Sequence, residues 1–73
     1  MQRHTRRRWD YVSENWKSLR GAVRRRWSKL KHEDMELIQG KRDVLIASVQ
    51  KRYAITAEEV HQQIEEWLEI VGG

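Results

Sequence analysis

Apolar residues recur at helical spacing in the N-terminal half of the chain, and no other feature constrains its fold as strongly. The spacings are 4, 3, 4, 4 and 3 residues in the series Val12, Trp16, Leu19, Val23, Trp27 and Leu30. At about 100° per residue these positions form one narrow stripe on a helix. The pattern predicts a helix over about residues 12–30, which takes in Trp9 if it begins earlier. The chain has no proline, the residue that most strongly breaks a helix.

The middle of the chain predicts a short helix followed by a longer one. Met35 and Ile38 form an apolar pair, and Leu45, Val49 and Tyr53 follow at spacings of four residues. A glycine at position 40 lies between the two groups and is the expected break. Because the apolar positions stay in phase through this glycine, a single kinked helix is the alternative.

The last helix has the clearest start. Thr56 followed by Glu59 is the pattern of a capping box, and Ile55 with Val60 fits a hydrophobic staple. An apolar edge then runs toward the C-terminal end through Ala57, Val60, Ile64, Trp67 and Val71.

Helices with a single apolar face must pack on one another to be stable. At 73 residues the chain is one domain with little spare core for a cofactor. We expect an all-α domain over residues 9–73, preceded by a basic disordered tail over residues 1–8. The predicted structural core is Trp16, Leu19, Val23, Trp27, Leu30, Ile38, Leu45, Val49, Tyr53, Val60, Ile64 and Trp67.

A set of residues in register from about position 13 to 67 is similar to a known protein family. It comprises Asn15-Trp16-Lys17, Gly21, Val23, Trp27, Lys29-Leu30, Asp34, Ile38, Gly40-Lys41-Arg42-Asp43, Leu45, Val49-Gln50, Arg52-Tyr53 and Glu58-Glu59. This pattern resembles the CsbD-like proteins. The run from Gly40 to Asp43, with Tyr53 ten residues later, is its most specific part.

The resemblance implies a compact array of four helices, in which one helix can be as short as a single turn, packed crosswise in pairs in a SAM-like arrangement. It also implies a bacterial protein linked to the general stress response, with no established molecular activity and no known catalytic residues. Three features depart from the family pattern. His32 stands where a capping threonine is usual, Ala54 replaces a glycine, and the extension through Arg8 is longer and more basic.

Charge is distributed unevenly along the sequence. Residues 1–31 carry eleven Lys and Arg against two acids, whereas residues 32–73 carry four against nine. This split suggests a basic face that meets an anion, or two halves that attract each other. The residues that we expect to contact an anion or nucleic acid are Arg6, Arg7, Arg8, Lys17, Arg20, Arg24 and Arg25. A solvated basic face without a partner is the simpler interpretation, and binding to an anionic membrane ranks below nucleic acid.

Two other features have structural interpretations. We expect Arg42 and Arg52 to cover apolar surface with their stems while their heads reach carboxylates such as Asp34 or Glu66. Gly21 lies opposite the apolar stripe, where a glycine costs about 1 kcal/mol relative to alanine. A neighbouring helix or a bend would explain it.

The residues that carry chemistry are sparse and scattered. There is no cysteine, and the three histidines, His4, His32 and His61, lack metal-ligand spacing. No serine lies in a nucleophile turn, and no glycine-rich phosphate loop is present. The tryptophans fit core packing better than base stacking, with Trp9 the one left open for exposure. We therefore expect no catalytic, metal or cofactor-binding residues.

These observations lead to three functional hypotheses. The first is a non-enzymatic, cytoplasmic, CsbD-like stress protein without a transmembrane segment, its partner unknown. The second is a weak, sequence-nonspecific nucleic-acid binder that uses the basic N-terminal half. We expect a monomer; an oligomer that pairs basic and acidic faces is the third hypothesis.

Overall fold

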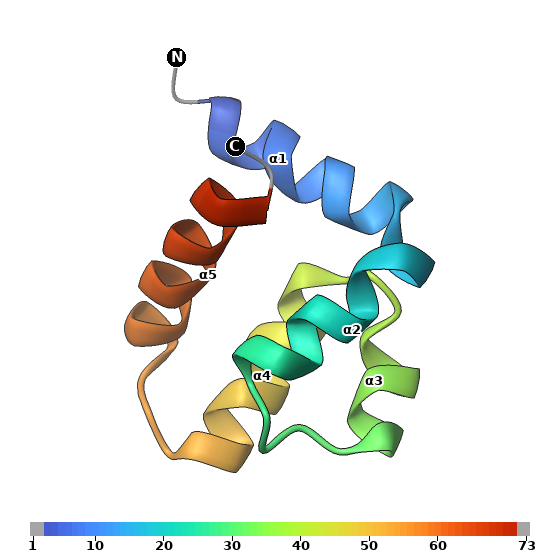
Figure 1. Cartoon of the computed structure of the whole chain (residues 1–73). Helices are drawn as coiled ribbons and strands as arrows, with labels where there is room; N and C mark the ends of the chain where they lie inside the picture. The colour runs from blue at the N-terminus through green and yellow to red at the C-terminus, as the bar shows by residue number, and fades with distance from the viewer. Residues whose placement is uncertain (1–2, 72–73) are drawn as a thin grey trace.

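Helices account for all the regular secondary structure in the described part of the chain. The computed structural model describes residues 3–71, with side chains from residue 9 onward. These residues form α1 (Arg3–Glu14), α2 (Trp16–Arg26), α3 (His32–Ile38), α4 (Arg42–Tyr53) and α5 (Ala57–Val71) (Figure 1). The all-α prediction is confirmed, but the described residues form five helices rather than four. Helix α1 begins at Arg3, within the segment predicted as a tail; the division into tail and domain at residue 9 stays a prediction.

The additional helix arises because the predicted first helix is divided at Asn15. This residue has φ −111° and ψ 30°, outside helical geometry. Its side-chain amide donates a hydrogen bond of 2.8 Å to the carbonyl oxygen of Tyr11. Asparagine competes for backbone hydrogen bonds in this way, which is why it favours helix ends over helix interiors. The apolar spacing alone could not reveal the division, since it continues in phase across position 15.

The predicted break at Gly40 is confirmed. Helix α3 ends at Ile38, and both Gln39 (φ 41°) and Gly40 (φ 82°) adopt left-handed backbone. A Cβ atom at Gly40 would lie 3.3 Å from the Cα and carbonyl oxygen of Ser13 in α1. Glycine at this turn therefore provides both the left-handed conformation and room for a neighbouring backbone.

The connection between α4 and α5 also turns through a left-handed residue, Ala54, at φ 56°. Its N–H donates to the carbonyl oxygen of Gln50 at 2.8 Å, which closes the C-terminal end of α4. The hydroxyl of Thr56 then accepts the N–H of Glu59 at 3.1 Å. The predicted cap of the last helix is thus present in the structure.

One core is shared by all five helices. The buried apolar residues are Trp9, Val12, Val23, Trp27, Leu30, Met35, Ile38, Leu45, Val49, Val60, Ile64, Trp67 and Leu68. Of the predicted core, Trp16, Leu19 and Tyr53 are only partly buried and pack against it. Trp9, which the sequence left open for exposure, is instead 7% exposed, and its indole N–H donates to the Gly40 carbonyl oxygen at 3.1 Å.

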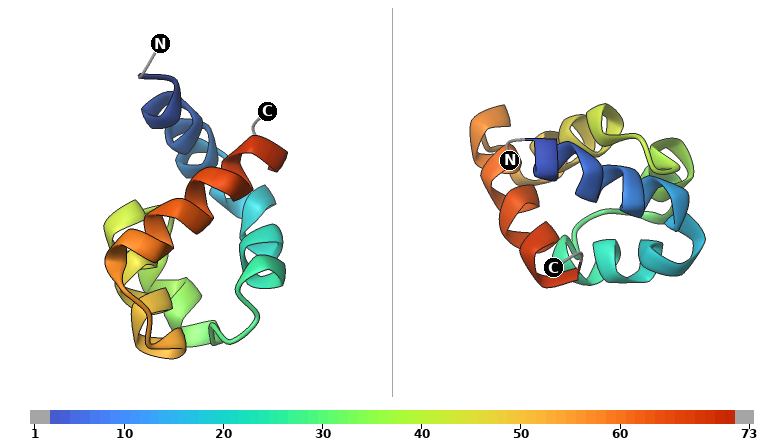
Figure 2. Two further views of the ribbon diagram at one scale, coloured as in Figure 1. Left: turned by 90° about the vertical axis from the view of Figure 1, so that its left-hand side faces the viewer. Right: turned by 90° about the horizontal axis from the view of Figure 1, so that it is seen from above.

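The first and last helices meet across the molecule. Helix α1 packs against α5, and the views in Figure 2 place the N-terminal end of α1 and the C-terminal end of α5 on the same side of the fold. The molecule measures 32 × 26 × 18 Å along its principal axes. None of the helices in residues 3–71 has the length and apolar character needed to cross a membrane. The SAM-like arrangement implied by the family resemblance stays a prediction.

Candidate anion-binding surface

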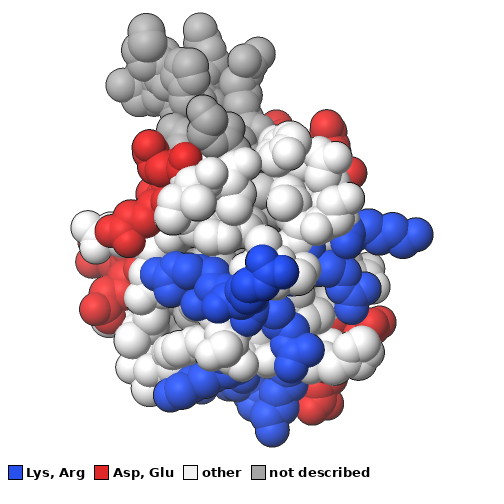
Figure 3. Space-filling view, viewed as in Figure 1, with Lys and Arg blue, Asp and Glu red and all other residues white. Residues whose placement is uncertain are grey.

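Basic side chains gather on the outer side of α2. Lys17, Arg20 and Arg24 follow one another at helical spacing, and Arg25 lies beside them. We call these four residues the cationic face. Lys17, Arg24 and Arg25 are exposed, and Arg20 is partly exposed. Figure 3 shows Lys and Arg side chains concentrated where Figure 1 places α2 and the segment after it, with acidic side chains along the side formed by α5.

Members of the cationic face differ in how far the protein itself engages them. Arg20 approaches Glu36 of α3 at 3.9 Å, and the Nε of Arg24 donates to the carbonyl oxygen of Leu30 at 3.3 Å. Lys17 and Arg25 form no ion pair with any residue that the structure describes. These two cations are the ones most available to an external anion.

The predicted contacts Arg6, Arg7 and Arg8 belong to α1 by backbone position. Their side chains lie outside the described ones. The structure therefore brings four of the seven predicted contact residues together on α2.

Four of the seven other Lys and Arg residues with described side chains contact groups of the fold: Arg26, Lys29, Arg42 and Arg52. The guanidinium of Arg26 lies 5.1 Å from the ring centre of Trp27, and the Lys29 ammonium lies 5.2 Å from that of Tyr53. Such stacked cations contribute modestly to stability at exposed sites. Composition alone cannot separate these structural cations from the free ones, because that distinction depends on which aromatic ring lies beneath each side chain.

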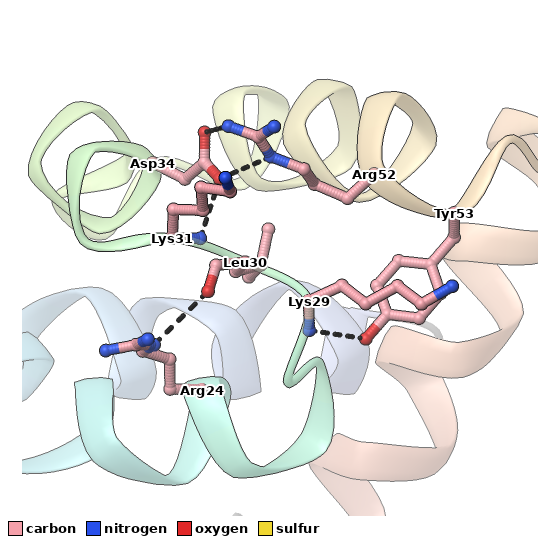
Figure 4. Close-up of polar contacts among 7 residues, drawn as sticks. All are labelled: Arg24, Lys29, Leu30, Lys31, Asp34, Arg52 and Tyr53. Atoms are coloured by element: carbon pink, nitrogen blue, oxygen red, sulfur yellow. Dashed lines mark hydrogen bonds and ion pairs between the residues drawn. The ribbon is translucent and has the colours of Figure 1, made fainter.

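The segment between α2 and α3 is fixed by three side chains from three helices (Figure 4). Arg24 of α2 holds the Leu30 carbonyl, as described above. The Tyr53 hydroxyl of α4 accepts the N–H of Lys29 at 3.0 Å. Asp34 of α3 accepts the N–H of Lys31 at 2.8 Å. This segment forms a fixed boundary to the cationic face.

Asp34 also joins α3 to α4. Its carboxylate accepts two hydrogen bonds from Arg52, at 2.8 Å from Nε and 3.1 Å from a terminal nitrogen. Arg52 therefore reaches Asp34, one of the two carboxylates named from the sequence for Arg42 and Arg52. The hydrogen bond from Arg52 is the main cause that holds the pKa of the Asp34 carboxyl below its usual value, and the Lys31 N–H adds to it, while burial opposes both. The N-cap of α3 is Lys31, so His32 does not occupy the capping position.

Arg42 connects three helices from the start of α4. A terminal nitrogen lies 3.2 Å from a carboxylate oxygen of Glu65 and 3.3 Å from Nδ1 of His61, both on α5. The guanidinium also lies 5.9 Å from the ring centre of Trp9 in α1. The predicted partner Glu66 was wrong by one residue, because Glu65 shares a helix face with His61 and Glu66 does not.

The indoles have few surfaces left for a ligand. Trp27 and Trp67 pack with their ring centres 5.8 Å apart, and Trp27 donates its N–H to Gln63 at 2.9 Å. Together with Trp9, they are buried. Trp16 alone is partly accessible.

Groups that would suggest catalysis or metal binding do not assemble in the described residues. No three acidic or histidine side chains there converge into a metal-sized cluster. His32 pairs with Glu36 at 3.3 Å on its own helix, and His61 faces Arg42. His4 lies outside the described side chains.

Comparison with known proteins identifies clear relatives. The chain is 36% identical to UPF0337 protein YjbJ of Escherichia coli K12 over 58 residues, which are 80% of this chain and 84% of that protein. It is equally similar to UPF0337 protein ECA0631 of Pectobacterium atrosepticum over the same shares. UPF0337 protein YjbJ of Salmonella typhimurium is 34% identical over 80% of this chain and 83% of its own length. No family model and no solved structure matches the chain.

Proposed function

Because the chain belongs to the UPF0337 family, which is the CsbD-like family, we propose that it is a non-enzymatic protein of the bacterial general stress response. The family resemblance carries this proposal. Its test is to measure the abundance of the protein in the bacterium that encodes it, before and after osmotic shock and entry into stationary phase. We expect a clear rise in the abundance of the protein under at least one stress. The proposal would be contradicted by constant abundance of the protein together with equal survival of a deletion strain and its parent under these stresses.

For the molecular activity, the second candidate is weak binding of nucleic acid through its phosphates, without sequence preference. The observation that favours it is the pair of exposed cations, Lys17 and Arg25, with no ion-pair partner among the described residues. Lys and Arg that neutralise phosphates release condensed counterions, and this supplies nonspecific affinity. Such binding typically has a Kd of about 10⁻⁴–10⁻⁶ M at physiological salt.

The state of the tryptophans supports a contact with the backbone of the nucleic acid rather than with its bases. Base stacking needs an accessible aromatic face, whereas Trp9, Trp27 and Trp67 are buried, and Trp16 is only partly accessible because it packs against the core. Helix α2 lies on the surface of the domain, and its accessible side carries long basic side chains that suit phosphates. Phosphate contacts position a protein on nucleic acid but carry no sequence information.

The experiment is a titration of a labelled 20-base-pair DNA duplex at low and at physiological salt. We expect the logarithm of the affinity to fall with the logarithm of salt with a slope of about −3, for three to four neutralised phosphates. The variant Lys17→Ala/Arg25→Ala should reduce the steepness of this slope by about 2. The variant in which Arg6, Arg7 and Arg8 are changed to Gln tests the remaining predicted contacts.

The matched control is Lys41→Ala/Lys51→Ala, which removes the same charge from two exposed positions at either end of α4. Equal losses of duplex affinity in the control and in the α2 variant would show that net charge alone drives binding. No binding by the unmodified protein at low salt would end this candidate.

A further inference from the structure

Gly21 is an exposed glycine in the middle of α2 with no structural partner. The helix runs without interruption from Trp16 to Arg26. A Cβ atom built at Gly21 meets no atom within 4 Å. No neighbouring helix therefore requires a glycine here, and the position is helical rather than left-handed. Glycine in such a position lowers helix stability relative to alanine, so the fold itself does not account for it.

The surroundings of Gly21 are basic on three sides. Lys17 precedes it by four residues, and Arg24 and Arg25 follow it by three and four, which makes all three its neighbours on the helix surface. All three are exposed. The result is an area of bare helix backbone surrounded by long cationic side chains, of which Lys17 and Arg25 form no ion pair with a described residue and Arg24 is held through its Nε by the Leu30 carbonyl.

We propose that Gly21 is the point at which the sugar-phosphate backbone of a nucleic acid lies directly against α2. This inference rests on the nucleic-acid binding proposed above. A strand seated over the glycine has Lys17 on one side and Arg24 and Arg25 on the other, so that phosphates before and after the contact each meet a cation. The distance along the helix from residue 17 to residue 25 is roughly 12 Å, which is the axial length of three to four nucleotides.

The composition of the exposed side of α2 favours nucleic acid over a lipid surface. A helix that lies on a membrane inserts an apolar face among the acyl chains. In α2 the apolar residues Leu19 and Val23 pack into or against the core, and Val23 is fully buried. The exposed side has only polar and basic residues beside Gly21, so it has nothing to insert.

The test compares Gly21→Gln and Gly21→Ala with the unmodified protein in the duplex titration. Both substitutions should raise the melting temperature, because both replace glycine with a better helix former. Gly21→Gln should nevertheless weaken duplex binding by about fivefold or more, since its side chain occupies the contact, and Gly21→Ala should weaken it less. The salt slope should stay unchanged because no charge is removed. Loss of affinity in a more stable variant is a result that a purely structural role cannot produce.

The control is Ala47→Gln, which adds bulk at an exposed position of α4 and should leave binding unchanged. If the unmodified protein binds DNA and Gly21→Gln binds equally well, this inference is overturned while the binding proposal stands. If the unmodified protein does not bind at low salt, both are overturned. Tighter binding to phosphatidylglycerol vesicles than to the duplex, weakened by Gly21→Gln, would assign the contact to lipid and overturn the assignment to nucleic acid.

Discussion

At the scale of single residues, the helix ends determine where backbone strain is located. Gln39 and Ala54 are the non-glycine residues with positive φ in the described chain, and each follows the last residue of a helix. A side chain in left-handed backbone is strained by about 1 kcal/mol or more, because Cβ approaches the following carbonyl. Gly40 avoids this penalty at a turn that lies close to Ser13 of α1.

Replacing Ala54 with glycine should therefore stabilise the protein by about 1 kcal/mol. The exposed Ala47, in the middle of α4, offers a control in which the same substitution has the opposite effect. There the backbone is helical, and Ala47→Gly should destabilise by about 1 kcal/mol. Urea unfolding followed by circular dichroism measures both changes. If Ala54→Gly is no more stable than the parent protein, the left-handed assignment at this residue is wrong.

At the scale of helices, two arginines on α4 connect it to its neighbours. Arg52 binds Asp34 of α3 with two hydrogen bonds, and Arg42 reaches α5 and the Trp9 ring of α1. Asp34 is 7% exposed as a side chain, so solvent screens this pair less than an ordinary surface ion pair. These polar contacts fix which faces of the short helices meet, whereas the apolar core alone tolerates small shifts.

The Asp34–Arg52 pair should make stability depend on pH in the acid range. The folded state holds the pKa of the Asp34 carboxyl below its usual value, which is about 3.9 in an unfolded chain. The stabilisation is thus complete at neutral pH and is lost as the pH falls below about 4 through the folded-state pKa. Asp34→Asn should lose about 1 kcal/mol at pH 7, and its stability should approach that of the parent at the acid end.

Urea midpoints measured from pH 7 down to pH 2 test this expectation. Asp10→Asn is the control, because it removes an exposed carboxylate with no partner among the described residues. A constant gap between Asp34→Asn and the parent across the whole pH range would show that the ionised carboxylate is not what stabilises the contact.

Removing Arg42 should lower the free energy of unfolding by about 1 kcal/mol and with it the melting temperature. Arg42→Ala loses the Glu65 contact, the His61 contact and the packing over Trp9 together. Lys41→Ala is the control, because Lys41 is the exposed residue next to Arg42 and makes none of these contacts. Scanning calorimetry of both variants gives the comparison, and an unchanged melting temperature in Arg42→Ala would rule out its connecting role.

At the scale of the whole molecule, every helix contributes to a single core. Trp9 and Val12 come from α1, Met35 and Ile38 from α3, and Trp67 from α5. No helix can bury its apolar face alone, so removing one helix would expose the apolar faces of the others. Charge is separated on the outside of this core, with the cationic face on α2 and acidic residues on α5.

A shared core predicts that the protein unfolds in one cooperative step. Tryptophan fluorescence, which reports on the indoles of α1, α2, α5 and the segment after α2, should change at the same urea concentration as helical circular dichroism. Acrylamide should quench the folded protein much less than the unfolded one, because three of the four indoles are buried. Separate transitions, or equal quenching in both states, would contradict a single core.

The sequence by itself determined the helical class, the break at Gly40, the cap at Thr56 and most of the core, because these follow from local spacing and backbone chemistry. It also indicated that Arg42 and Arg52 reach carboxylates, with Asp34 among those named, and it indicated the basic face. The structure alone revealed the division at Asn15, which comes from a local hydrogen bond to Tyr11 that apolar spacing does not record. The burial of Trp9 and the choice of Glu65 over Glu66 depend instead on how distant helices approach: the Trp9 N–H reaches the Gly40 carbonyl, 31 residues away. Periodicity describes one helix at a time and has no information about such contacts.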